Sequence, residues 1–327
     1  MRTTFYLNHL ELDWACPVWK PYLDELTQSN TLLRHDMRGF GLSFEEAPPQ
    51  SLDAWVRDLE AVVDAAGLDR FPLIGMCHGG AIAVEYAARH PQRVSHLVLL
   101  GAYVRGGMRR ARRAEERATR EVLMQLVEMG WGEANDAFNQ VWPTLLQPSA
   151  TRERLQALAD LQRQSSNSVN AVRLLRAAGE LDISEAAQKV RCPTLIFHTK
   201  RDRAAPFEEG RLLASLVPDA RFVPLESANH VLTELEPAWG EFVQELRAFL
   251  PGIAVPGKAA IEGLTPRELE ILECIAQGRD NAQTAATLGM SEKTVRNHIT
   301  RIFDKLAVEN RPQAIVRARE AGLGRER

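Results

Sequence analysis

Before residue 250 the chain alternates apolar runs of strand length with segments of helical period. We expect strands at five apolar runs: Thr31–Arg34, Phe71–Gly75, His96–Gly101, Pro193–Thr199 and Arg221–Leu225. Such alternation predicts an α/β domain with a mostly parallel sheet. Between about residues 103 and 190 the strand signals stop, and Arg- and Glu-rich helical segments replace them. We therefore expect a helical cap inserted into the sheet domain.

The pattern changes near residue 250. The stretch Phe249–Gly263 holds two prolines and three glycines and follows neither a helical nor a strand period. We place a linker at 251–262, between a first domain at 1–250 and a second at 263–327. A length of 327 residues, with 45% hydrophobic and 25% charged residues, agrees with two soluble globular domains.

The second domain has the pattern of four short helices. Thr265 and Glu268 fit a capping box around Pro266, which starts the first helix, and we expect Leu269 on the apolar face of that helix. Ser291 is placed to cap the third helix. The apolar stripe of the third helix has the spacing i, i+4, i+7 and i+11 and should face the core: Val295, Ile299, Ile302 and Leu306.

The charge of the second domain is unevenly distributed. Residues 259–290 hold two basic and five acidic side chains, whereas residues 291–327 hold nine basic and five acidic ones. The net charge of the whole chain is only -3, so the positive charge is concentrated on the last two expected helices, where a DNA-reading surface needs it. Charge and helix faces alone leave open a solvated helix in a small bundle.

The segment Leu264–Ile315 resembles the LuxR/FixJ-type helix-turn-helix domain over its whole length, including LTPRE, SEKTVRNHI and the closing KL and NR. The resemblance implies that the third helix enters the major groove of double-stranded DNA, and it assigns roles by position. By this resemblance we expect base edges to be contacted by Arg296, Asn297 and Thr300, and phosphates by Lys293, Thr294, Arg301 and Lys305. His298 lies near the apolar edge, where packing or an internal hydrogen bond is favoured over base reading.

In this family the fourth helix commonly supplies the dimer contact. That helix corresponds here to Pro312–Ala321, with Ile315 and Ala318 as expected contact residues. The resemblance therefore implies a homodimer, which would bind two half-sites roughly 34 Å apart.

A second motif lies in the first domain. The sequence FPLIGMCHGG runs an apolar strand into Gly75-Met76-Cys77-His78-Gly79, followed by a helix. This is the nucleophile-elbow pattern with cysteine in the serine position, and the flanking glycines suit a sharp strand-to-helix turn.

The first domain resembles the α/β-hydrolase fold through this elbow and through RHDMRGFGLS, which is similar to a loop after an early strand. Asp202 follows the strand TLIFHT and His230 follows FVPLESAN, so nucleophile, acid and histidine occur in the chain order of that family. The resemblance implies Cys77 as nucleophile, His230 as general base and Asp202 as the acid that orients it. The His78 backbone N–H would be one oxyanion donor.

Two departures from the family pattern bear on catalysis. Cysteine replaces the usual serine, so Cys77 is either a nucleophile, able to hold an acyl group as a thioester, or part of an inert elbow that lines a sensory pocket. The first hairpin of the usual sheet is missing, which means a late start or a clipped sheet. Leu7–Leu10 then stand where the second oxyanion donor belongs. We favour a weak or inactive site.

The expected cap carries two further groups of side chains. Its arginines attract nucleic acid or an anionic ligand, or, as we favour, form a solvated face beside glutamates: Arg105, Arg109, Arg110, Arg112 and Arg113. Its aromatic residues either cover a ligand pocket over Cys77 or pack in the core: Trp131, Phe138 and Trp142.

The remaining features narrow the class of protein. Four cysteines are widely spaced without a CxxC pair, so we expect free thiols, no metal and no cofactor. No segment reads as a signal peptide or membrane span, which predicts a cytoplasmic protein without membrane contact.

The main function hypothesis is a DNA-binding transcription regulator that responds to a small acyl or ester-like ligand. The alternative is a Cys-dependent esterase, thioesterase or lactonase with an attached DNA-binding domain. A third is an interaction module whose first domain only dimerises.

Overall fold

The computed structural model describes residues 1–3, 8–28, 30–45, 48–131, 140–250, 263–306, 308, 310–320 and 323–324. The chain divides into two compact units, whose boundary along the chain falls between Pro251 and Gly252. The expected linker at 251–262 lies outside the described residues.

The first unit is built on a parallel sheet. Among the described residues the sheet has four strands in the order β1-β2-β3-β4: β1 (Phe71–Met76), β2 (Val94–Leu100), β3 (Thr194–Thr199) and β4 (Arg221–Leu225). All three pairings are parallel, which confirms the predicted α/β sheet.

The expected strand at Thr31–Arg34 is wrong. These residues form no ladder, and the Leu33 carbonyl accepts one hydrogen bond, from the Arg2 amide at 3.1 Å. Arg2 itself forms only an isolated bridge to Ile74 of β1. An apolar run becomes a strand only where a neighbouring strand pairs with it, and among the described residues the Arg2 amide is the one backbone group that bonds to Leu33.

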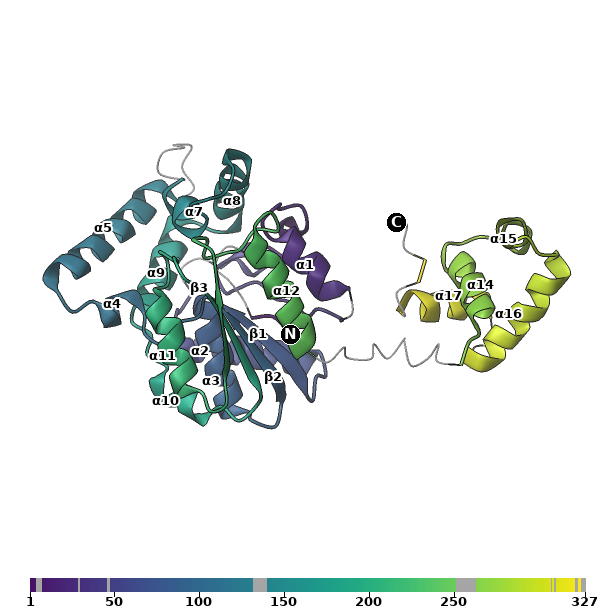
Figure 1. Cartoon of the computed structure of the whole chain (residues 1–327). Helices are drawn as coiled ribbons and strands as arrows, with labels where there is room; N and C mark the ends of the chain where they lie inside the picture. The colour runs from purple at the N-terminus through teal and green to yellow at the C-terminus, as the bar shows by residue number, and fades with distance from the viewer. Residues whose placement is uncertain are drawn as a thin grey trace. The chain divides into compact units, whose positions relative to one another are not determined.

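Helices cover both faces of the sheet (Figure 1). On one face α1 (Lys20–Thr27) and α12 (Pro237–Phe249) bring the rings of Tyr22 and Phe242 to a centroid distance of 5.7 Å. The other face carries α3 (His78–Arg89), α11 (Phe207–Leu216) and, against α3, α2 (Leu52–Ala65). Two short 3₁₀ helices complete the start of the unit: Leu12–Trp14 and Gly41–Ser43.

Between β2 and β3 the described residues form helices and no strand of the sheet. They are α4 (Gly107–Arg110), α5 (Ala114–Gly130), α7 (Val141–Leu146), α8 (Arg152–Ser165), α9 (Ser168–Gly179) and α10 (Ser184–Lys189). In Figure 1, α5, α7, α8 and α9 lie together beyond one end of the sheet, whereas α10 packs on α3 and α11. None of the described helices is long and apolar enough to span a membrane.

The second unit consists of α14 (Pro266–Ala276), α15 (Asn281–Leu288), α16 (Glu292–Leu306) and α17 (Arg311–Glu320). The predicted capping box forms between Thr265 and Glu268, and Ser291 Oγ accepts a hydrogen bond from the Thr294 amide. The predicted stripe of α16 is buried throughout: Val295, Ile299, Ile302 and Leu306.

One expectation for α14 is wrong. Leu269 is 39% exposed and does not belong to the apolar face. Ile271 takes that place beside Leu272 and Ile275, because the buried side of the helix is turned so that Glu268 also points inward. Glu268 is 3% exposed and is satisfied there by the capping box and by Lys305.

Candidate functional site

The turn between β1 and α3 holds Cys77 in a strained conformation. Its φ is 52° and its ψ is -127°, a combination that non-glycine residues rarely adopt. Two glycines let strand and helix approach each other: a Cβ on Gly75 would lie 2.7 Å from the Gly80 Cα, and one on Gly80 would lie 2.4 Å from the Ala102 Cβ. The predicted elbow is confirmed, and it presents the thiol beyond the end of the strand.

His230 and Asp202 meet at the same end of the sheet. Asp202 follows β3, His230 follows β4, and the His230 Nδ1 donates to the Asp202 Oδ2 over 2.6 Å. The second carboxylate oxygen accepts from the amides of Ala204 and Ala205 at 2.8 and 2.9 Å. These bonds fix the carboxylate, which in turn fixes the orientation of the imidazole.

The thiol is the other partner of the imidazole. Burial lowers the pKa of His230, but the charge of Asp202 and then the sulfur of Cys77, which also shares a hydrogen bond with it, raise the pKa to well above its usual value. Burial alone would raise the pKa of Asp202, yet the charge of His230 together with the hydrogen bonds from His230 and the Ala205 amide outweighs it, and the net pKa is lowered. Such an imidazole can take up the thiol proton while the carboxylate stabilises the resulting cation.

His230 is also held from two other sides. A Cβ on Gly101, where φ is 59°, would lie 2.7 Å from the His230 Cε1, so only glycine allows the ring to pack here. From the cap, the Leu146 carbonyl of α7 accepts the His230 amide at 2.8 Å. Sheet and cap therefore position this histidine together.

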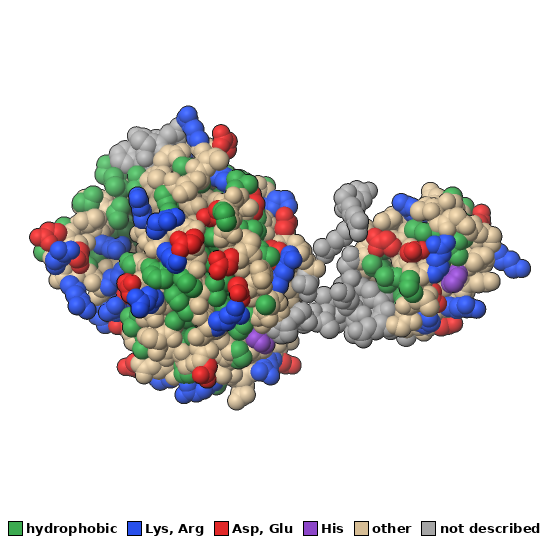
Figure 2. Space-filling view, in the orientation of Figure 1, with side chains coloured by type: hydrophobic (Ala, Val, Ile, Leu, Met, Phe, Trp, Pro, Cys, Tyr) green, Lys and Arg blue, Asp and Glu red, His purple; other side chains and the backbone are tan. Residues whose placement is uncertain are grey.

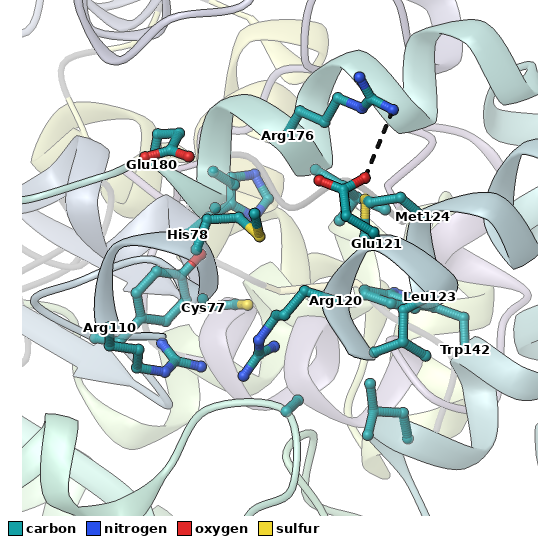
Figure 3. A pocket seen from close by; sticks show the side chains of 18 of the residues that line it. Cys77, His78, Arg110, Arg120, Glu121, Leu123, Met124, Trp142, Arg176 and Glu180 are labelled. Atoms are coloured by element: carbon teal, nitrogen blue, oxygen red, sulfur yellow. Dashed lines mark ion pairs between the residues drawn. The ribbon is translucent and has the colours of Figure 1, made fainter. Parts of the chain in front are cut away.

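A cavity of about 310 Å³ opens over Cys77 (Figure 3). Its apolar wall comes from the cap and includes Met124, Trp142, Leu146 and Leu175. Of the aromatic residues that the sequence singled out, Trp142 lines the cavity, whereas Trp131 is buried and donates its Nε1–H to the Ser166 carbonyl. Phe138 lies outside the described residues.

The third helix of the second unit, α16, presents the predicted contact residues to solvent. All seven are exposed: Lys293, Thr294, Arg296, Asn297, Thr300, Arg301 and Lys305. His298 is half-buried at the edge of this face, which agrees with packing, although its Nδ1 has no hydrogen-bond partner among the described residues.

Comparison with known families assigns each of the two units to a family. A model of the alpha/beta hydrolase fold matches residues 7–237, and a model of the luxR family of bacterial regulatory proteins matches residues 262–318. The chain belongs to the α/β-hydrolase fold family. It carries a C-terminal LuxR-type DNA-binding domain, so both predicted resemblances are confirmed.

Relatives and solved structures extend the match of the hydrolase domain. Proteins named putative carbamate hydrolase RutD from Agrobacterium fabrum and Escherichia coli O1:K1 are each 26% identical, over 229 and 226 residues. The alignments cover 67% of this chain and 83% and 81% of those proteins. A hydrolase from Pseudomonas aeruginosa has a TM-score of 0.62 at 21% identity, covering 76% of this chain and 88% of that one. An enol-lactonase from Burkholderia xenovorans has a TM-score of 0.60 at 22% identity, covering 76% and 89%.

The oxyanion site of this α/β-hydrolase domain is described in part. His78 is the first residue of α3 and lines the cavity, so its amide lies at the positive end of the helix. The segment Leu7–Leu10, where the second donor belongs, is described only from Asn8 onward. The amides of His9 and Leu10 donate to the carboxylates of Asp13 and Asp36, and Leu7 lies outside the described residues.

The side chain of His78 has a separate environment. It is 1% exposed and packs edge-on against the Trp55 ring. Burial and the nearby His230 lower its pKa to about 3, which keeps the ring neutral. Its contribution to the site is therefore its backbone position rather than a titrating side chain.

The sequence does not place cationic residues in the cavity. It favours a solvated face for the group that includes Arg110, with nucleic acid or an anionic ligand as the alternative, and does not single out Arg120, yet both residues line the cavity over Cys77. The favoured interpretation agrees with the exposure of Arg109, Arg112 and Arg113, of which Arg113 pairs with Glu116, whereas Arg105 is half-buried and pairs with the buried Glu209. Figure 2 shows basic and acidic side chains interspersed on the visible face of the hydrolase unit. A helical period cannot say which arginine of a cluster turns inward.

Two details of the LuxR-type domain also depend on its tertiary structure. The Lys305 ammonium lies 2.7 Å from the Glu268 carboxylate and 3.0 Å from the Gly263 carbonyl, so it is engaged within the domain. Ala318 is fully buried in the core of its own domain and is not available as a dimer contact, which corrects that expectation. Ile315 is half-buried, and Ala321 lies outside the described residues.

Proposed function

We propose that this protein is a transcription regulator whose α/β-hydrolase domain binds a small acyl or ester-like ligand and controls how a homodimer presents its LuxR-type domains to DNA. One observation carries the proposal: a single chain joins a domain with a largely apolar cavity to a DNA-binding domain. Ligand binding can alter DNA affinity only if the two DNA-binding states differ in their affinity for the ligand.

The direct test is an electrophoretic shift with the DNA upstream of the gene for this chain, with and without candidate esters. We expect a shift whose midpoint changes with ligand, and a half-site spacing near one helical turn in the footprint. No shift by the folded dimer under any condition would overturn the regulator. A footprint that no ligand alters would favour the interaction module, in which the hydrolase domain only dimerises.

A second candidate is a Cys-dependent hydrolase, and the contact of Cys77 with the His230–Asp202 pair favours it. In this reaction His230 takes the thiol proton and the sulfur attacks the acyl carbon. The carbon–oxygen bond of the ester then breaks, His230 gives the proton to the leaving alcohol, and a Cys77 thioester remains. Water completes a turnover by releasing the acid and restoring the thiol.

The fate of the thioester separates an enzyme from a sensor. The His78 amide, at the start of α3 and on the cavity wall, is the one expected oxyanion donor that supports this reaction among the described residues, and a site that lacks one such donor typically reacts about 100- to 1000-fold more slowly. A slow second step would leave the acyl group on Cys77 as a lasting signal. We therefore favour weak turnover over a fast enzyme.

Short aryl esters and aryl carbamates test this second candidate. The carbamates are included because relatives bear the name putative carbamate hydrolase. The readouts are aryl alcohol release and the intact mass of the protein, for wild type and Cys77→Ala. One equivalent of alcohol released with a matching gain in mass indicates a persistent thioester, and continuous release indicates an enzyme. Equal rates for wild type and Cys77→Ala would exclude Cys77 as the nucleophile.

A further inference from the structure

Two guanidinium groups lie beside the Cys77 thiol in the cavity. Figure 3 shows the ends of Arg110, from α4, and Arg120, from α5, next to each other and close to Cys77. Both side chains are half-buried. Their positions come from separate helices of the cap, so the pair exists only in the folded domain.

Each guanidinium is held in place by the protein. Arg110 lies 5.7 Å from the centroid of the Tyr103 ring and donates from Nη1 to the Arg105 carbonyl at 2.7 Å. Arg120 rests against the backbone of α4, where a Cβ on Gly107 would lie 2.9 Å from its Cζ, Nε and Nη1. A glycine at this position thus makes room for the guanidinium.

Among the described residues, no acidic side chain forms an ion pair with Arg110 or Arg120. Glu121 lines the cavity but turns to Arg176 at 4.0 Å, as the dashed line in Figure 3 marks. Glu180 is exposed and is drawn well apart from both arginine ends in that view.

Glu209 and Glu116 are engaged by other arginines, Arg105 and Arg113. Burial and the proximity of Arg120 lower the pKa of Arg110, although the charge of Glu209 acts in the opposite direction.

The pair also separates two hollows. A second one, of about 460 Å³, shares Arg110 and Arg120 with the Cys77 cavity and adds Arg203 and Glu116 to its wall, where Glu116 is paired with Arg113. An anion placed between the two arginines would thus lie where the two hollows meet, with the rest of the ligand free to extend towards Cys77. Apolar side chains, among them Leu123 and Leu145, line both hollows near the pair.

We propose that Arg110 and Arg120 bind a free carboxylate of the ligand, so that the ligand is an anionic acyl compound such as the monoester of a short dicarboxylic acid. Its carboxylate lies between the guanidiniums, its methylene chain against the apolar wall, and its acyl carbon at the Cys77 sulfur. Planar, bidentate pairing of guanidinium with carboxylate gives such a site its specificity. This assignment rests on the proposed ligand binding by the hydrolase domain.

The test compares 4-nitrophenyl hydrogen glutarate, which carries a free carboxylate, with its methyl ester, which is neutral. Intact mass and nitrophenolate release measure acylation of Cys77 in the full chain. We expect the anionic ester to react at least about tenfold faster, and Arg110→Gln or Arg120→Gln to lower this anionic-to-neutral ratio by about 10- to 100-fold. The matched control is Arg109→Gln, an exposed arginine of the same short helix that should keep the wild-type ratio.

One further variant and one binding measurement complete the test of the carboxylate site. Gly107→Ala retains both charges but displaces the Arg120 guanidinium, so it too should lower the ratio. Calorimetric titration with glutarate and with butyl phosphate reports binding without any reaction, and we expect glutarate to bind more tightly. An unchanged ratio in all three cavity variants, or tighter binding of the phosphate, would overturn the carboxylate site.

The same measurements separate this site from the proposed function. If glutarate binds wild type and not the arginine variants while neither ester labels Cys77, the anion site stands and the hydrolase candidate fails. If glutarate binds but leaves the DNA shift unaltered, the site stands and the regulator fails. If glutarate does not bind and the two esters react equally, the site fails whatever the DNA result.

Discussion

The two units of this protein place their functional side chains in opposite ways. In the LuxR-type domain the predicted DNA contacts follow one another along a single exposed helix, α16. In the hydrolase domain the thiol, imidazole and carboxylate come from turns after β1, β4 and β3, and the arginines come from the cap. A site on one helix can be read from local spacing, whereas a site assembled from many elements requires the fold.

The basic side chains of the two regions also differ in their exposure to solvent. The cations of α16 lie in water, where an unpaired charge costs little free energy. Arg110 and Arg120 are half-buried beside each other, where the same charges repel and are less well solvated. An exposed basic helix therefore suits a polyanion such as DNA, and we propose that the half-buried basic pair suits one small anion.

The largest expected effect tests the hydrolase side of this comparison. Cys77→Ala should abolish covalent labelling by acyl esters completely, because the nucleophile is gone. DNA affinity measured without ligand should be unchanged. The measurement is intact mass after incubation with ester, beside an electrophoretic shift, and Cys192→Ala is the matched control because Cys192 is also a buried free thiol. Labelling that persists in Cys77→Ala would place the reactive group elsewhere.

The DNA side of the comparison has the next largest effect. Arg296→Ala should weaken specific DNA binding by about 10- to 100-fold, if its guanidinium reads base edges. Lys293→Ala should instead weaken specific and non-specific DNA alike and reduce the slope of log affinity against log salt by about one. Fluorescence anisotropy across a salt series distinguishes the two. The assignment of roles fails if Arg296→Ala changes both kinds of DNA equally.

A third effect concerns the stability of the assembled site. Asp202→Asn should lower the free energy of unfolding of the hydrolase domain by about 2 kcal/mol, because a buried imidazolium loses its charged partner. The raised pKa of His230 means that this contribution is complete below about pH 6.5 and disappears as the pH rises through the folded-state pKa. Because the pKa of Asp202 is lowered, the stabilisation from this ion pair also disappears as the pH falls below about 4 towards the folded-state pKa of the carboxyl.

Tryptophan fluorescence can follow this unfolding selectively, since all six tryptophans precede residue 250. Urea titrations should show the largest difference between wild type and Asp202→Asn at about pH 5–6. A difference that does not vary with pH would mean that the interaction is not one of charge.

The smallest effect concerns Lys305, an exposed residue of α16 that also forms an ion pair within its own domain. Lys305→Ala should lower the melting temperature of the DNA-binding domain by about 2–4 °C at neutral pH, because Lys305 pairs with Glu268. Lys305 and Thr265 together lower the pKa of Glu268 to about 2, so the stabilisation is present above about pH 4.3 and is lost as the pH falls towards 2. Calorimetry of the full chain should therefore show a smaller difference at low pH.

The degree to which the site could be predicted follows from how local each feature is. The elbow around Cys77 was readable because its glycines and its nucleophile are neighbours in the chain. That Thr31–Arg34 forms no strand could not be predicted, because the apolar character of a run does not reveal whether a pairing partner exists. Leu269 was misplaced because a helix of this length has several faces with apolar residues, and only the packing of α14 selects one.

The two domain families, the strained turn at Cys77 and the helix with the expected DNA contacts can all be recognised in the sequence, because each depends on residues within a few positions of one another. The fold was needed to show that His230 contacts both Asp202 and Cys77, that Lys305 turns back to Glu268, and that Arg110 and Arg120 line the cavity. Burial and Coulomb interactions depend on distance in space, which the spacing of residues along a chain does not give.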